Sequence, residues 1–97
     1  MRKIIIPSII AKNQEEFDER FERVKSLSKV FQLDVMDGKF VGNKSLRFGL
    51  ELIRGKKYEV HLMVKDPLEW IRDNIDKADR IAIHVESDNV EEAVDLV

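Results

Sequence analysis

Two short segments of the sequence carry the side chains best suited to chemistry. Residues 32–41 read Gln-Leu-Asp-Val-Met-Asp-Gly-Lys-Phe-Val, and residues 60–64 read Val-His-Leu-Met-Val. Because side chains alternate between the two faces of a strand, Asp34 falls on the same face as Met36. By the same rule His61 falls on the same face as Met63. A carboxylate and an imidazole at the ends of neighbouring strands can hold a divalent metal ion or transfer a proton.

The predicted strands and helices that position these groups alternate along the chain. Apolar, β-branched runs predict strands over residues 3–8, 30–35, 58–64 and 80–85. Capping patterns at Asn13, Asp66 and Asp88 predict helix starts after the first, third and fourth strands. The predicted inward faces of these helices are Phe17, Phe21, Val24 and Leu27, then Leu68, Ile71 and Ile75, and finally Val90, Ala93, Val94 and Val97. This alternation favours an α/β fold with a parallel sheet, although a solenoid or an open doubly wound sheet would show the same repeat.

The segment after the second strand has two interpretations. We expect a helix over residues 45–54, ended by Gly55. The same segment places Leu46, Phe48, Leu50 and Leu52 at alternate positions, which suits a strand equally.

Composition limits the classes of protein to which the chain can belong. The 97 residues predict a single domain, 1–97, and the net charge of -2 from 17 basic and 19 acidic residues disfavours nucleic-acid binding. Without cysteine, any metal must be bound by imidazole, carboxylate, carbonyl or water. The apolar runs are too short to span a bilayer, and Met1 to Lys3 lead directly into a predicted strand without a signal peptide. We therefore expect a cytoplasmic protein that binds no membrane.

Four motifs, in order, resemble the ribulose-phosphate 3-epimerase family of isomerases, which act in pentose phosphate metabolism. They are Pro7-Ser8-Ile9, residues 32–41, residues 60–64 and Ile83-His84-Val85-Glu86. The resemblance implies a TIM-type (βα)8 barrel, which needs about 250 residues. The chain therefore corresponds to the N-terminal half of that barrel, with four βα units. Because such a half-barrel has two open edges, we expect a homodimer that closes the barrel by pairing strand one of each copy with strand four of the other.

The resemblance also implies roles for individual residues. Asp34 would be a catalytic acid/base and a metal ligand, and His61 would be a second ligand for zinc, iron or manganese. The pocket for a pentulose phosphate would be lined by Ser8, Met36, His61 and Met63. Gln32 stands where the family usually has a histidine ligand, and an amide oxygen binds such metals more weakly. The family's strand-seven aspartate and its late phosphate-binding loops have no counterpart here, so we expect epimerase activity to be weak or lost.

Other interpretations of the same residues stay open. Asp37 is predicted to cap backbone amides of the following turn rather than to act in catalysis. Asp34 and His61 are also consistent with relics in a non-catalytic, self-assembling half-barrel scaffold, or with one half of a split epimerase that needs a distinct partner. His84 and Glu86 are predicted to point toward the same barrel mouth, without an assigned role.

Overall fold

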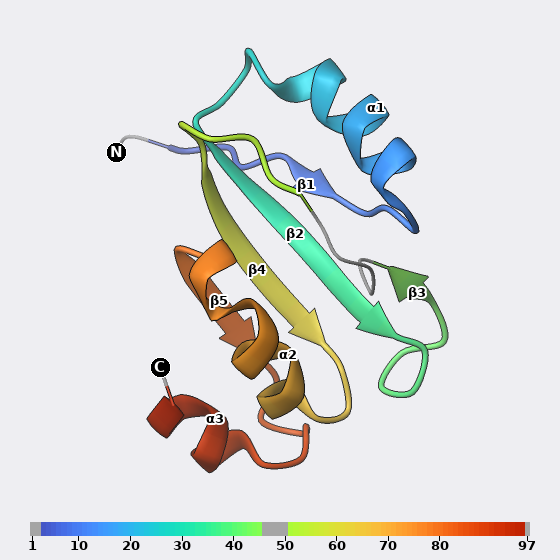
Figure 1. Ribbon diagram of the computed structural model, residues 1–97, viewed down its shortest axis with the longest axis vertical. Helices are drawn as coiled ribbons and strands as arrows, with labels where there is room; N and C mark the ends of the chain where they lie inside the picture. Colours follow the sequence, from blue (N-terminus) through green and yellow to red (C-terminus); the bar gives the residue numbers. More distant parts are fainter. Residues whose placement is uncertain (1–2, 46–50, 97) are drawn as a thin grey trace.

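The computed structural model describes residues 3–45 and 51–96 of the chain. Its sheet has the order β1-β2-β4-β5, formed by the parallel strands β1 (Ser8–Ile9), β2 (Val30–Asp37), β4 (Lys57–Met63) and β5 (Arg80–Ile83) (Figure 1). A short β3 (Lys44–Ser45) pairs antiparallel with the end of β2. The described helices are α1 (Gln14–Val24), α2 (Pro67–Asn74) with the 3-10 turn η1 (Ile75–Lys77), and α3 (Val90–Leu96). The predicted α/β class with a parallel sheet is confirmed.

Polar caps start the first two α-helices where the sequence predicts them. The Asn13 side chain accepts a hydrogen bond from the Glu16 amide at 2.8 Å, and the Asp66 carboxylate accepts one from the Leu68 amide at 3.0 Å. Each bond satisfies a backbone donor that the first helical turn leaves without a partner. None of the helices in the described part of the chain is long and apolar enough to cross a membrane.

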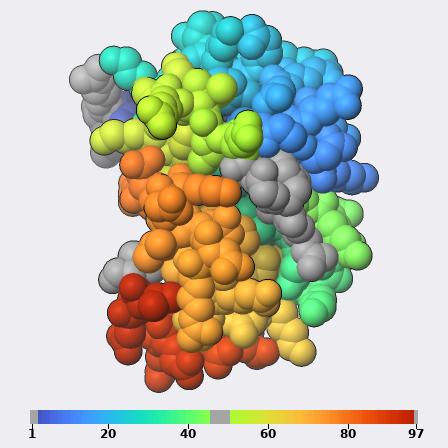
Figure 2. All heavy atoms as spheres, in the orientation of Figure 1, coloured from blue at the N-terminus to red at the C-terminus, as the bar shows by residue number. Residues whose placement is uncertain are grey.

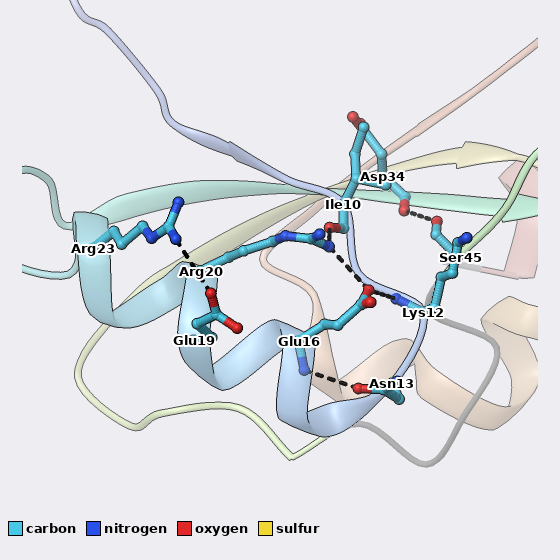
Figure 3. A network of polar contacts seen from close by, with 9 residues as sticks. All are labelled: Ile10, Lys12, Asn13, Glu16, Glu19, Arg20, Arg23, Asp34 and Ser45. Atoms are coloured by element: carbon cyan, nitrogen blue, oxygen red, sulfur yellow. Dashed lines mark hydrogen bonds and ion pairs between the residues drawn. The ribbon is translucent and has the colours of Figure 1, made fainter.

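A polar network joins α1 to the chain that leads into it (Figure 3). The Glu16 carboxylate accepts the backbone N–H of Lys12 at 3.0 Å and an N–H of the Arg20 guanidinium at 3.0 Å. Arg20 also donates to the backbone carbonyl of Ile10. One helix face therefore fixes the segment that directly follows β1.

Aromatic side chains connect α1 to the sheet. The Phe17 and Phe21 rings of α1 lie 5.8 Å apart, and Phe21 packs at 5.0 Å on Phe31 of β2. Phe31 in turn lies 6.3 Å from Tyr58 of β4. These four side chains are buried, and together with the aliphatic residues of β2 and β4 they form the core. In Figure 2 the atoms of α1 (blue) and α2 (gold to orange) lie on the side of the molecule that is turned toward the viewer.

Three residues predicted to face the core are instead exposed. Leu27 is 73% exposed, Ile75 is 39% exposed and Val94 is 61% exposed. Leu27 and Ile75 lie beyond the last residues of α1 and α2, so the helical periodicity no longer directs them inward. In α3 only Ala93 is buried among the residues described, and Val97 lies outside the described residues.

The first strand is much shorter than the predicted range of residues 3–8. Ser8 aligns with Gln32, so residue 6 reaches the level of Val30, where β2 begins. The residues before it extend beyond the first residue of β2 and pair with no strand in the described part of the chain, and Ile4 and Ile5 are 79% and 86% exposed. A strand needs a partner for its backbone as well as a suitable sequence.

The predicted helix over residues 45–54 is wrong at both of its described ends. Ser45 belongs to β3, where its hydroxyl donates to the backbone carbonyl of Asp34, and residues 51–54 are not helical. Residues 46–50 lie outside the described residues. The fourth strand also ends earlier than residue 85, at Ile83.

Asp37 ends β2 and caps backbone amides of the following turn, as predicted, and it also binds an amide of the loop after β4. Its Oδ1 accepts the N–H groups of Lys39 at 2.8 Å and Phe40 at 3.0 Å, and its Oδ2 accepts that of Lys65 at 2.9 Å. Partial burial acts to raise the pKa of the Asp37 carboxyl, but the donors from Lys65, Phe40 and Lys39 outweigh it and hold the pKa below its usual value. The ionised carboxylate therefore stabilises the loops after β2 and β4.

We predict that Asp37→Asn destabilises the protein at neutral pH by about 1 kcal/mol. Asparagine is uncharged, and the NH2 group that replaces Oδ2 cannot accept a hydrogen bond from the Lys65 N–H. The pKa of the Asp37 carboxyl is lower in the folded protein than in the unfolded chain, where it is about 3.9. The ionised carboxylate therefore stabilises the fold above the unfolded-state pKa, and this stabilisation is lost as the pH falls through the folded-state pKa. The difference between the two proteins should thus shrink below about pH 4. Urea denaturation at fixed protein concentration measures it, with the exposed Asp95→Asn as control. A difference that does not change with pH would contradict this role.

Candidate functional site

Asp34 lies on the sheet face opposite to the aliphatic core residues Leu33 and Val35 of the same strand. It is only 8% exposed, and both of its oxygens have hydrogen-bond donors. The Gln32 amide donates to Oδ1 at 2.8 Å, and the Ser8 hydroxyl donates to Oδ2 at 3.2 Å. Two adjacent strands thus fix the carboxylate in one orientation, which is the arrangement that a positioned acid or base requires.

His61 lies directly beside Asp34, as the sequence predicts. The two residues are register partners in the parallel pair of β2 and β4, and His61 Nδ1 lies 3.6 Å from Asp34 Oδ1. This distance is longer than a hydrogen bond. The imidazole nitrogen and the carboxylate oxygen are nevertheless close neighbours.

The second histidine joins the same cluster. His84 follows β5, and its Nε2 lies 2.8 Å from Nε2 of His61, within hydrogen-bond distance. The ring planes of the two histidines are nearly parallel, at 16°. The Phe40 ring lies 4.9 Å from the His84 ring, and His84 Nδ1 lies 3.8 Å from Glu86 Oε2. The cluster therefore runs from Asp34 through His61 and His84 to Glu86.

Ser8, Met36 and Met63, the other predicted pocket residues, lie on the same strands as this cluster or on the strand next to it. Met36 and Met63 are register partners one step further along β2 and β4, with Met36 buried and Met63 partly exposed. Ser8, the remaining predicted pocket residue, is exposed while its hydroxyl binds Asp34. All of these groups lie at the carboxyl ends of parallel strands, where α/β folds place their ligand sites. Their contact with a substrate stays a prediction.

The donor atoms fit a divalent metal only in part. Asp34 Oδ1 and His61 Nδ1 are spaced as two ligands of one ion can be, with metal–ligand bonds of about 2.0–2.2 Å. Within residues 3–45 and 51–96, however, no group of three or more His, Asp or Glu side chains could hold an ion. Gln32 directs its amide N–H toward Asp34, so it acts there as a hydrogen-bond donor rather than as a ligand. A complete metal site would need further ligands.

A hollow of about 280 Å³ lies at a different place, between the end of β2 and α2. Val35, Val64 and Trp70 supply its apolar wall, and Asp37, Lys65 and Asp66 are among its charged residues. It does not include Asp34 or His61. The polar cluster and its hydrogen bonds, rather than this hollow, therefore define the candidate site.

The sequence predicted that Asp34, His61, His84 and Glu86 lie at this end of the sheet, but it did not predict all of the contacts between them. Asp34 and His61 were expected to be neighbours, whereas the contact between His61 and His84 was not. His84 shares the alternation of Ala82, which is the register partner of His61, and this signal places both histidines on one face. Phe40 gave no such signal, because it lies in a turn where side chains do not alternate.

The comparison with known families agrees with this geometry. Residues 4–97 match the family model described as the ribulose-phosphate 3 epimerase family. The match extends over nearly the whole chain, and it includes every residue of the cluster around Asp34. The chain therefore belongs to the ribulose-phosphate 3-epimerase family.

Proposed function

We propose that this chain acts as a ribulose-phosphate 3-epimerase-like isomerase, in which Asp34 transfers the proton of a pentulose phosphate. The observation that carries the proposal is the buried Asp34 carboxylate, fixed by Ser8 and Gln32 and next to His61, in a chain of this family. Epimerisation removes a proton beside a ketone and returns it on the opposite face. A carboxylate that is oriented by two donors and open toward a neighbouring imidazole suits that step.

A divalent metal ion is the proposed cofactor, with Asp34 and His61 as its ligands from this chain. When bound, the ion supplies positive charge that stabilises the enediolate oxygens. Ser8 and Gln32 keep the carboxylate in position, and the remaining ligands come from elsewhere.

We expect the chain alone to turn over substrate weakly. The loops after β4 and β5 contain Asp66, Glu86 and Asp88, whose charges repel a phosphate dianion, and Lys65 offsets them only in part. Asp34 is also the single carboxylate of the cluster that is buried, whereas the Glu86 side chain is 69% exposed. The cluster therefore holds one well-positioned acid/base group. Removal of a proton from one face of the substrate and return of a proton to the other face uses two.

The proposed partner is a second copy of the chain. Within the described sheet, β1 and β5 are the edges, and apolar side chains lie exposed beside both. Ile4 and Ile5 precede β1, and Val85, which is 82% exposed, follows β5. Pairing β1 of each copy with β5 of the other would satisfy both edges, cover these side chains and close a barrel around two copies of the site. A distinct partner chain that supplies the other strands is the alternative, and it would make this chain one half of a split enzyme.

A scaffold without catalysis is the second candidate function. The incomplete metal donor set favours it, because Gln32 binds Asp34 instead of presenting a ligand. In that case the cluster would contribute to the fold and the assembly alone.

We predict a homodimer by light scattering at micromolar concentration. Ile5→Lys should shift the protein toward monomer, because a charge at the β1 edge opposes its burial. Leu27→Lys is the matched control, since Leu27 is equally an exposed apolar residue but follows α1. A folded wild-type monomer, or equal effects of the two substitutions, would count against self-assembly and favour the split enzyme.

We predict metal-dependent conversion of ribulose 5-phosphate in the presence of zinc, manganese or iron(II). Asp34→Asn should lower kcat by about 10²- to 10⁴-fold, because it removes the acid/base group. The exposed Asp76→Asn should leave the rate unchanged. A folded wild-type protein that shows no turnover with any of these ions would favour the scaffold.

We predict that Gln32→His raises affinity for zinc by about tenfold or more, because it replaces an amide donor with an imidazole ligand beside Asp34. Isothermal titration calorimetry measures the change without requiring activity. Gln14→His, which adds a histidine at a partly exposed position of α1 away from Asp34, is the control. Equal affinities of the two variants would show that Asp34 and His61 do not form part of a metal site.

A further inference from the structure

The four parallel strands have a continuous register from one edge of the sheet to the other. Ser8 of β1 is opposite Gln32 of β2, and Gln32 is opposite Glu59 of β4. Glu59 is in turn opposite Arg80 of β5. A line drawn across the sheet through opposite residues therefore joins Ser8 at one edge to Arg80 at the other.

In a closed barrel such a line does not return to the residue from which it starts. A (βα)8 barrel has a shear of eight, so a line that crosses all of its strands returns to the first strand eight residues away. Two-fold symmetry divides this displacement equally between the copies of a homodimer, which gives four residues to each. Arg80 of one copy would then be opposite a residue of the other copy that is four positions from Ser8, either Ile4 or Lys12.

The described elements are compatible with only one of these two directions. If Lys12 were opposite Arg80, residues 12–15 would have to pair with β5, but Asn13 caps α1 and Gln14 is its first residue. If Ile4 is opposite Arg80, β5 pairs instead with residues 4–7, which directly precede β1. The segment before β1 therefore has the length that closure of the barrel requires.

We propose that residues 4–7 of each copy pair in parallel with β5 of the other copy, with Ile4 opposite Arg80. This inference rests on the homodimer of the proposed function, and it specifies the register of that dimer. The pairing gives a neighbouring strand to the segment that contains the exposed Ile4 and Ile5.

The backbone before β1 is directed suitably for this pairing. The Gln32 N–H donates to the Pro7 carbonyl at 2.8 Å, so the backbone groups of Pro7 face β2. Because these groups alternate in direction along a strand, those of Ile6 and Ser8 face the open edge. The missing N–H of the proline is therefore on the β2 side, and it removes no hydrogen bond from the pairing with the other copy.

The side chains that this register brings together are complementary. Ile5, which is 86% exposed, lies opposite Ile81, which is partly buried against the core. The exposed Lys3 and the exposed Asp79, which have opposite charges, are also opposite each other. Without the displacement of four residues, Ile5 would instead be opposite Lys77 of η1, which is not part of a strand.

The same register brings a residue of the second copy to the candidate site. Ser8 of the other copy would lie opposite His84, and alternation places both side chains on the face that carries Asp34. Within one copy, Ser8 binds Asp34 at one end of the cluster, and His84 contacts His61 toward the other end. The cluster of one copy would therefore continue into the cluster of the other through Ser8.

Because the chain contains no cysteine, disulfide formation between copies can test the register without interference from native thiols. Ile5→Cys combined with Ile81→Cys should shift the protein from the monomer to the dimer position in non-reducing gel electrophoresis after mild oxidation. Opposite residues of adjacent strands have a Cα separation that a disulfide can bridge. Mass spectrometry of the linked peptides identifies the bond.

Two matched pairs test the other registers. Ile5→Cys with Lys77→Cys corresponds to no displacement, and Ile5→Cys with Val85→Cys corresponds to a displacement of eight. Val85 is 82% exposed, so accessibility alone would favour its pair over that of Ile81. Faster linkage in either matched pair, or no linkage in any of the three, would overturn the proposed register.

Hydrogen exchange on the wild-type protein gives a measurement that requires no substitution in β5. In the dimer the Ile6 N–H should exchange slowly, because it donates to the other copy, whereas the Ile5 N–H, which faces away from that copy, should exchange fast. The protection of Ile6 should be lost when Ile5→Lys opposes assembly. Fast exchange of the Ile6 N–H in a wild-type dimer would contradict the pairing.

None of these measurements depends on turnover, so failure of the register and failure of the proposed function can be told apart. An inactive dimer linked through Ile5→Cys and Ile81→Cys would disprove the proposed isomerase activity alone. An active dimer that is linked faster through one of the matched pairs would disprove this register alone.

Discussion

The parallel pairing of β2 with β4 is the interaction on which the rest of the structure depends. Its register runs from Val30 opposite Lys57 to Met36 opposite Met63, and it places Asp34 directly beside His61. A shift by one residue would move every side chain of β2 to the other face of the sheet. The aliphatic core and the polar cluster would then exchange sides. The register of β2 against β4 therefore determines both the packing under the helices and the position of the polar cluster on the other face.

This register separates two environments that are one residue apart. Leu33 and Val35 contribute to the core cluster, together with side chains from the helices, and bury apolar surface. Asp34 lies between them in sequence but on the opposite face, where Ser8, Gln32 and His61 surround its carboxylate. Burial of that carboxylate is tolerated because its oxygens are hydrogen-bonded. The hydrophobic packing therefore holds the polar site in place without contact with its reactive atoms.

Local pattern was enough to predict some of these features and not others. The long apolar runs of β2 and β4 and the caps at Asn13 and Asp66 were predicted correctly, because their signals lie within a few residues. The run that includes Ile4 and Ile5 has strong strand preference, yet its pairing depends on a neighbour that its own sequence does not specify. Ser45 pairs with Met36 of β2 across the intervening loop, and this strand pairing takes the place of the predicted start of the helix.

The candidate site shows the same division. Asp34 and His61 were predicted from motifs on single strands, and their adjacency followed from strand pairing. The bond between His61 and His84 required the offset between β4 and β5, which places Ala82 rather than His84 opposite His61. Neither the reach of a side chain nor the turn that brings Phe40 against His84 can be read from residue alternation.

The order of the strands has a consequence for how the chain folds. In the described sheet the parallel strands lie in the order in which they occur along the chain, so each is added next to its predecessor. No strand has to insert between two that are already paired, and each closure joins neighbouring units of the chain. Contacts between nearby segments form faster than those between distant ones, because less chain entropy is lost in closing the loop. This sheet can therefore grow in one direction during synthesis, with each new strand built on the edge that the previous one presents.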